Sequence, residues 1–380
     1  MPTARCAKPE ELEALIALSD RTFRKPGQTS MGTAYAMLFS ENNAENLLVM
    51  EEDGIPATLV GLLPMQLSVA GCAISAVGMG SVCTETAYRG RNFADTLVKM
   101  AIDQCRENDV HVLLISGNRS LYLRNDCMEV GSVRHFTLMP GEDWQGLAEQ
   151  AGTVRPYDEE RDVRAMLRLM EADQAYYRRS PEEMSLLIRS AAVMSNYSAE
   201  QHVLVHTADN GEMLGYIVVG LPAKGDSLTA EVVEYAGGDE TVVRLLSEVA
   251  GHFKPERTNV PVMPHRHALA EKLASTGCAV KETTIPGTIR MIDFTGMWHA
   301  LRPYMAGRIG EEAASRLECV DYANGNYRIR LGNETLTVDL RGATTLVFNG
   351  PQLTGQGELK RVLGELFPLP FVYTSNLNFV

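Results

Sequence analysis

The sequence predicts a mixed α/β protein in which two successive sheets are flanked by helices and a smaller α+β region follows. Strand-like runs over 46–84 lead into an amphipathic helix near 91–108 and then into the apolar strand 110–116. A second series of hairpin strands followed by a helix occupies 202–253. Short antiparallel strands with tight-turn residues come after position 315. Strand, helix and strand in succession indicate sheets that contain a parallel pair.

The first region is expected to form one sheet. A helix over 9–23 has apolar residues at helical spacing, with a proline and two glutamates in its first turn. Gly54 and Gly71 separate the hairpin strands that follow. A short helix near 119–126 and a strand at 131–140 should complete this sheet, with a parallel pair near its middle.

The second region repeats this order. Two helices are expected at 158–177 and 180–192, and Ser180 followed by a proline is a good helix start. The strands and helix over 202–253 then follow the same plan as the first region, which suggests a structural repeat. The third region begins with a helix at 294–305 and continues with strands joined by an Asn–Gly and a Gly–Asn turn.

Composition excludes several classes of protein. The 380 residues carry a net charge of −13, which argues against sequence-independent binding to nucleic acid. The seven cysteines include no CxxC pair, so we expect reduced thiols in a cytoplasmic protein, without a disulfide framework or a metal site. No secretory leader and no membrane-spanning run is expected. The close-spaced segment His265-Arg266-His267 is interpreted as polar surface.

The segment "YRGRNFADTLVKMA", residues 88–101, is the first candidate for chemistry. It joins an arginine- and glycine-containing loop to a helix, and a helix N-terminus presents unpaired N–H groups and partial positive charge. A pyrophosphate can bind at such a point where small residues allow close approach. By itself the pattern more often marks an ordinary strand-to-helix turn whose arginines face solvent.

Residues 89–94 resemble the R-x-x-G-x-G/A signature of the GNAT acetyltransferases, with Asn92 in the position of the first glycine. Asparagine tolerates left-handed backbone geometry, so we expect the loop to keep its shape. The resemblance implies acetyl-CoA as co-substrate and no metal. The implied cofactor-binding residues are Val82, Cys83, Thr84, Arg89, Gly90, Arg91, Asn92, Phe93 and Ala94.

Tyr122 is the candidate general acid. It lies in "GNRSLYLRNDC", directly after the apolar strand, where a phenol could protonate a departing thiolate. The alternative is a tyrosine that only packs beneath a loop. The segment also resembles the Y-x-R-x-G-[YC] motif of the Eis-like (enhanced intracellular survival) acetyltransferases, except that Asp126 replaces the glycine.

The Eis-like resemblance extends over the whole chain and implies three domains. Residues 1–147 would be the catalytic GNAT domain and 148–290 a second GNAT-like domain that lacks the cofactor motif. Residues 291–380 would resemble sterol carrier proteins, with the C-terminal tail directed to the active site. In this family the terminal carboxylate assists the amine, a role that falls here to Val380. The alternative is a tail that packs on its own domain.

These observations predict an acetyl-CoA-dependent N-acetyltransferase that moves an acetyl group directly to a primary amine in a ternary complex. The amine would belong to a small molecule or a peptide, and the resemblance implies a homo-oligomer. Tyr122 and Val380 are the predicted catalytic residues. The competing hypothesis is a non-catalytic acyl-CoA- or lipid-binding protein.

Overall fold

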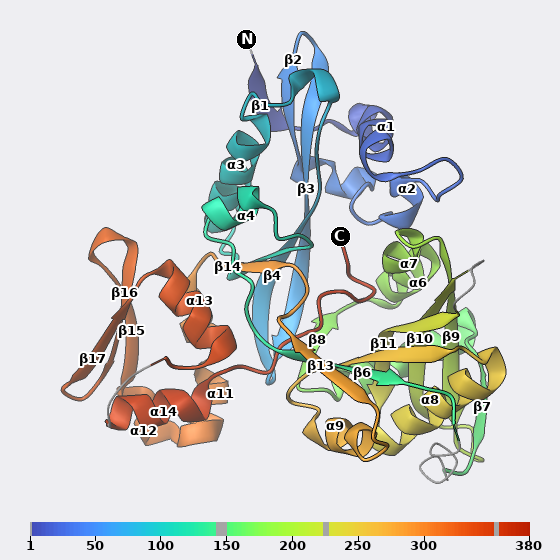
Figure 1. Ribbon diagram of the computed structural model, residues 1–380. Coiled ribbons are helices and arrows are strands. Elements are labelled where there is room, and N and C mark those ends of the chain that lie inside the picture. Colours follow the sequence, from blue (N-terminus) through green and yellow to red (C-terminus); the bar gives the residue numbers. More distant parts are fainter. Residues whose placement is uncertain (1, 142–149, 223–227, 353–356) are drawn as a thin grey trace.

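The computed structural model describes residues 2–141, 150–222, 228–352 and 357–380. Figure 1 shows three parts: the N-terminal part around the long β3–β4 hairpin, a second sheet flanked by helices, and a smaller C-terminal part on the other side of that hairpin. The C-terminus lies at the centre, close to β4 and between the first two parts. The chain is thus a mixed α/β protein, as its sequence predicts.

The first sheet is mixed. In spatial order it contains β1 (Thr3–Cys6), β2 (Leu47–Glu52), β3 (Ile55–Val69), β4 (Cys72–Thr84), β5 (Val112–Ile115) and β14 (Thr288–Met291). Neighbours are antiparallel except β4 and β5, which form the expected parallel pair. One face is covered by α3 (Phe93–Glu107) and α4 (Ser120–Arg124), and the other by α1 (Leu12–Phe23), with α2 (Met31–Ala34) beside it. Leu97 and Val98 of α3 are completely buried against the sheet, as the helical spacing of apolar residues predicts.

The second sheet repeats this plan. Its spatial order is β13 (Ala279–Thr283), β6 (Val133–Leu138), β12 (Arg257–Val262), β11 (Thr229–Gly237), β10 (Met213–Pro222), β9 (Ala199–Thr207) and β7 (Thr153–Pro156). Helix α8 (Asp239–Phe253) connects β11 to the parallel strand β12. In the same way, α3 connects β4 to the parallel strand β5 in the first sheet. Helices α8 and α9 (His267–Ala274) cover one face, and α5 (Glu159–Glu171) and α6 (Pro181–Ser190) the other, followed by α7 (Ala192–Ser195). The repeat expected from element order is therefore present in the fold.

Two segments pair differently from the sequence expectation. The strand predicted at 131–140 forms as β6, but it pairs with β12 and β13 in the second sheet, whereas β14 from the second region pairs with β5. The two regions thus exchange their last strands. The helix predicted over 158–177 ends at Glu171, because residues Ala175–Arg178 form β8 and pair with the far end of β3.

The C-terminal part contains a three-stranded antiparallel sheet, β15 (Leu317–Tyr322), β16 (Asn326–Leu331) and β17 (Glu334–Val338). Asn324 and Gly325 both have positive φ, 62° and 73°, as the predicted Asn–Gly turn requires. Its helices are α10 (Phe294–Ala300), α11 (Arg302–Ile309), α12 (Glu311–Arg316), α13 (Leu340–Asn349) and α14 (Glu358–Leu366). After α14 the chain leaves this part and runs without regular structure to Val380 at the first sheet. None of the described helices is long and apolar enough to cross a membrane.

Candidate active site

The first sheet opens between its two parallel strands. β4 and β5 are paired from Ala76 and Val112 to Met79 and Ile115. β5 ends there, whereas β4 continues for five more residues, to Thr84, with no partner on that side among the described strands. Backbone groups of β4 beyond Met79 are therefore free to bind a ligand that enters between the strands.

A β-bulge lies in this open part of β4. Gly80 of β4 pairs with Gly61 of β3, and Cys83 of β4 pairs with Leu59. Two residues of β4, Ser81 and Val82, therefore face one residue of β3. Ser81 has φ 50°, an uncommon value for a residue other than glycine. Its buried hydroxyl is hydrogen-bonded to that of Ser19 in α1, which helps to hold this geometry. The bulge redirects the backbone at the predicted pantetheine-binding residues Val82, Cys83 and Thr84.

The predicted pyrophosphate loop connects β4 to α3. Asn92 is the N-cap of α3 with φ 61° and ψ 13°, so it adopts the left-handed conformation expected for it. Gly90 also has positive φ, 80°, and a side chain there would meet open space. The first-turn amides of α3, including those of Phe93 and Ala94, point out of the helix end without capping by the Asn92 side chain. The loop therefore has the form of an anion-binding helix N-terminus.

The two loop arginines have different surroundings. Arg91 forms an ion pair with Glu52 at 2.6 Å, and its guanidinium lies 4.9 Å from the ring centre of Phe93. Arg89 donates from Nε to the carbonyl oxygen of Thr84 at 3.2 Å and is exposed. The charge of Arg91 is thus partly neutralised, and Arg89 is the arginine better placed to offer its charge to a phosphate.

Tyr122 lies on α4 beside the end of β5. Its ring is buried, 7% exposed, and would be 3.2 Å from a side chain at Gly117, two residues after β5. Burial raises the pKa of the phenol, although Arg119 opposes the change. The hydroxyl has no hydrogen-bond partner within the described residues. A neutral phenol with a free proton fits the predicted role of a proton donor.

Val380 reaches the same opening from the other side of β4. A Cβ atom added to Gly80 would lie 2.9 Å from the carboxyl oxygen of Val380, and one added to Gly78 would lie 2.6 Å from its side chain. Val380 and Gly78 also line a small cavity together with Ile115 and Ser116 of the β5 end. The C-terminal carboxylate therefore lies directly on β4, next to the bulge.

The sequence interpretation did not single out Gly78, Gly80 or Ser81. The signal for the two glycines is "GMG" inside a strand, a pattern that marks close approach of another chain segment. The thiol of Cys83 instead faces Ser19 and Thr22 of α1, and burial raises its pKa to about 12. It stays protonated at neutral pH and is unsuited to carry an acyl group.

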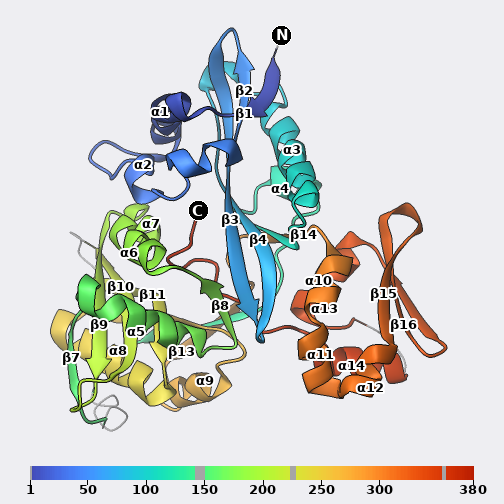
Figure 2. The same cartoon turned by 180° about the vertical axis from the view of Figure 1, so that it is seen from behind.

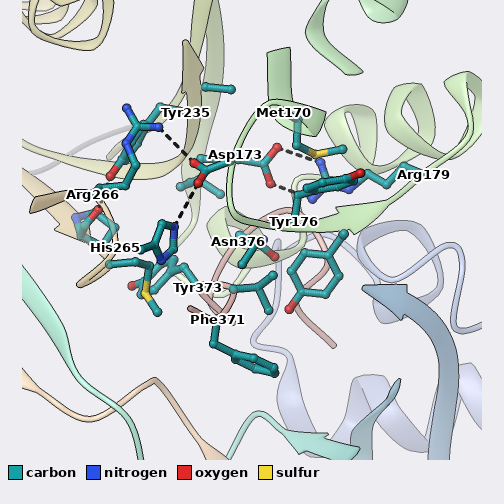
Figure 3. Close-up of a pocket in the computed structure, with 18 residues that line it drawn as sticks. Met170, Asp173, Tyr176, Arg179, Tyr235, His265, Arg266, Phe371, Tyr373 and Asn376 are labelled. Atoms are coloured by element: carbon teal, nitrogen blue, oxygen red, sulfur yellow. Dashed lines mark hydrogen bonds and ion pairs between the residues drawn. The ribbon is translucent and has the colours of Figure 1, made fainter. Parts of the chain in front are cut away.

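The second sheet has the same opening with different chemistry. β11 pairs with β12 only over its first residues, Thr229 to Glu231, and then departs from it. At the end of β11, Arg266 donates to the carbonyl oxygen of Gly237 and forms an ion pair with Asp239 at 2.7 Å. It also forms an ion pair with Asp173 at 3.0 Å (Figure 3). A cation and two carboxylates thus occupy the position that the predicted pyrophosphate loop has in the first sheet.

His265 and Arg266 were interpreted from the sequence as polar surface, which is wrong. Their side chains are only 7% and 14% exposed and both contact Asp173 (Figure 3). Burial alone would raise the pKa of Asp173, but the hydrogen bond and charge of His265 and the charge of Arg266 lower it overall. Within the described residues no group of three or more His, Cys, Asp or Glu side chains has the arrangement of a metal site.

Comparisons with known proteins agree with this architecture. Residues 3–127 match the family model described as Acetyltransferase (GNAT) domain. Solved structures similar over the whole chain are GCN5-related N-acetyltransferases from Anabaena variabilis (14% identity, TM-score 0.68, 99% of this chain and 98% of that one) and Kribbella flavida (14%, 0.68, 100% and 98%). Eis1 from Mycobacterium abscessus is also similar (12%, 0.61, 92% and 90%). No curated protein matches the chain.

Residues 3–127 are therefore similar to a GNAT acetyltransferase domain, and this match supports an acyltransferase activity for that region. The open β4–β5 pair and the N-terminus of α3 both lie within it. At identities of 12–14% the three structures establish the fold they share with this chain.

Proposed function

We propose that this protein is an acetyl-CoA-dependent N-acetyltransferase of the Eis-like type, which transfers acetyl directly to a primary amine in a ternary complex. The observation that supports this most is the position of the Val380 carboxylate. It lies against Gly80, where β4 and β5 part, and Tyr122 lies beside the end of β5. An acceptor that enters between them would meet an acid on one side and a carboxylate on the other.

In this proposal the backbone binds the co-substrate. Acetyl-CoA supplies a thioester whose acetyl group is activated for transfer. Amides at the β4 bulge, from Val82 to Thr84, hold the pantetheine arm and donate hydrogen bonds where negative charge develops on the acetyl oxygen. The amides from Arg89 to Ala94 bind the pyrophosphate, and Arg89 adds charge. This set fits the group because the first-turn amides of α3 have no side-chain cap and the loop carries no bulky side chain at Gly90.

The two catalytic residues handle protons. Val380 accepts a hydrogen bond from the acceptor ammonium, orients it and passes its proton to water as the nitrogen attacks. Tyr122 donates its phenolic proton to the thiolate that leaves when the carbon–sulfur bond breaks. Both groups are held by the fold before the acceptor arrives, so the geometry of attack contributes to the rate.

The proposal includes the remaining features implied by the resemblance. The acceptor is a small molecule or a peptide, the C-terminal part is sterol-carrier-like, and the protein assembles as a homo-oligomer. A cytoplasmic location agrees with seven free cysteines in the structure.

The proposal is tested by measuring CoA release from acetyl-CoA with a panel of polyamines, aminoglycosides and lysine peptides. Turnover with at least one amine is expected, and deletion of Val380 should lower kcat with little change in the Kd of acetyl-CoA. Binding of acetyl-CoA without turnover on any amine would instead favour a non-catalytic acyl-CoA-binding protein.

A further inference from the structure

The C-terminal tail crosses the opening of the second sheet on its way to the first. The pocket in Figure 3 lies at that opening and is lined by β11 from Val233 to Ala236, by Pro261 of β12, and by Phe371, Tyr373 and Asn376 of the tail. The place that corresponds to the acyl-CoA opening of the first sheet is thus filled by the chain's own last residues.

Arg179 joins both sheets and this tail. It follows β8, which belongs to the first sheet, and its side chain is 1% exposed. Two of its nitrogens donate to the two carboxylate oxygens of Glu234 on β11, each at 2.7 Å, as the dashed lines beside Arg179 in Figure 3 show. The third, Nε, donates to Oδ1 of Asn378 at 2.7 Å. Tyr216 also donates to Glu234, at 2.9 Å.

Asn378 is two residues from the terminal carboxylate and is itself fixed. It is 7% exposed, and its backbone N–H donates to Oδ1 of Asn376 at 2.9 Å. The backbone N–H of Phe379 donates to the carbonyl oxygen of Asn376 at 3.0 Å. The last residues therefore form a turn whose outer side is hydrogen-bonded to Arg179 and whose end lies on Gly80.

The ion pair alone does not account for this arrangement. Burying both charges costs a large desolvation free energy, so a buried ion pair is weak evidence for stability. Its role here is better explained by the orientation that it gives to the guanidinium group. The pair with Glu234 occupies two of the three nitrogens and fixes the guanidinium plane. The remaining Nε–H then points in one direction only, and it is Asn378 that it meets.

We propose that Arg179, oriented by Glu234, is a positioning residue that holds the Val380 carboxylate at the active site through Asn378. The opening of the second sheet serves as the seat of the tail instead of a second acyl-CoA site. This inference rests on the proposed function, because the carboxylate it positions is the one assigned to the acceptor amine.

Two variants remove the same hydrogen bond from opposite sides. Asn378→Ala leaves the Arg179–Glu234 pair intact, and Arg179→Lys keeps a cation for Glu234 but lacks the Nε branch. Each should lower kcat by about 10- to 100-fold, since a misplacement of about 1 Å can cost on the order of 100-fold. The KM for acetyl-CoA should stay unchanged. Arg178→Lys is the matched control, because Arg178 is exposed at the neighbouring position and should retain full activity.

The decisive comparison uses the chain without Val380. If Arg179 and Asn378 act through the carboxylate, their substitution causes no further loss in that background, and the double variant Arg179→Lys/Asn378→Ala is no worse than either single one. A loss of equal size with and without Val380 would mean that the pair only stabilises the fold, and full kcat in Asn378→Ala would also overturn the proposal.

A second readout does not depend on turnover. Carboxypeptidase A should release Val380 faster from both variants than from the wild type and from Arg178→Lys, because the tail end is no longer held. Equal release rates would refute the holding role. If the wild type acetylates no amine at all, the proposed function fails, whereas the release rates still decide whether Arg179 holds the tail.

Discussion

Substitution of Gly80 by alanine should displace the C-terminal carboxylate while leaving the strand in place. The three atoms nearest to an added Cβ all belong to Val380: its carboxyl carbon, which is the closest, its oxygen at 2.9 Å and its Cβ at 3.2 Å. Gly80 does not have positive φ, so alanine fits the backbone of β4. The tail is therefore the part that must move.

The size of the effect follows from these distances. Carbon atoms pack without repulsion at about 3.5–4.0 Å, so the carboxyl carbon must retreat by well over half an ångström. A displacement on the order of 1 Å corresponds to about a 100-fold lower kcat, or about 2.7 kcal/mol of activation free energy. Steady-state CoA release measures kcat, and acetyl-CoA affinity should not change, because the pyrophosphate loop is untouched.

Two controls separate displacement from general damage. In a chain that lacks Val380 the three atoms nearest to the added methyl group are absent and the terminal carboxylate belongs to Phe379, so Gly80→Ala should cause no further loss there. In that truncated chain, where the clash is absent, the free energy of unfolding of Gly80→Ala should be equal or slightly higher, because alanine restricts the unfolded chain more than glycine does. A Gly80→Ala enzyme with wild-type kcat, or one that loses activity equally without Val380, would refute the role assigned to the carboxylate.

Three further outcomes are expected. Tyr122→Phe should lower kcat by about 10²–10⁴-fold without changing the Kd of acetyl-CoA from calorimetry, and unchanged turnover would exclude the phenol as acid. Asn92→Gly should bind acetyl-CoA at least as tightly as wild type, whereas Asn92→Val should cost about 1–3 kcal/mol in urea unfolding, because φ is 61°. Cys83 has a pKa of about 12 in the folded state and about 9 when exposed, so its stabilising contribution is complete below pH 9 and is lost as pH rises towards 12. The urea midpoint should fall over that range, and Cys83 should resist a thiol reagent at pH 8 in the folded protein.

Local signals in the sequence predicted the parts of the fold that depend on neighbouring residues. The helix start at Ser180 forms a capping box with Glu183, and the Asn–Gly turn at Asn324 has the backbone that the dipeptide favours. The backbone of the predicted pyrophosphate loop belongs to the same class, because the left-handed preference of Asn92 is a property of that residue itself.

Pairing between distant segments could not be predicted in this way. β6 and β14 are both short strands, and nothing local tells either one which sheet it joins. The residues of β8 were predicted to be the end of the preceding helix, because the strand they pair with, β3, lies more than a hundred residues earlier and leaves no local signal. His265 was predicted to lie on the surface because its partner, Asp173, is also distant in sequence.

The exchange of β6 and β14 has a consequence for the site. Each sheet carries a strand from the other region next to its parallel pair, so the two openings are held at a fixed separation by backbone hydrogen bonds. The C-terminal tail lies in the opening of the second sheet and places the Val380 carboxylate in the opening of the first. A constant separation between the two openings is needed for the carboxylate to keep that position. The proposed catalytic role of Val380 requires such a fixed position, which Arg179 and the exchanged strands together provide.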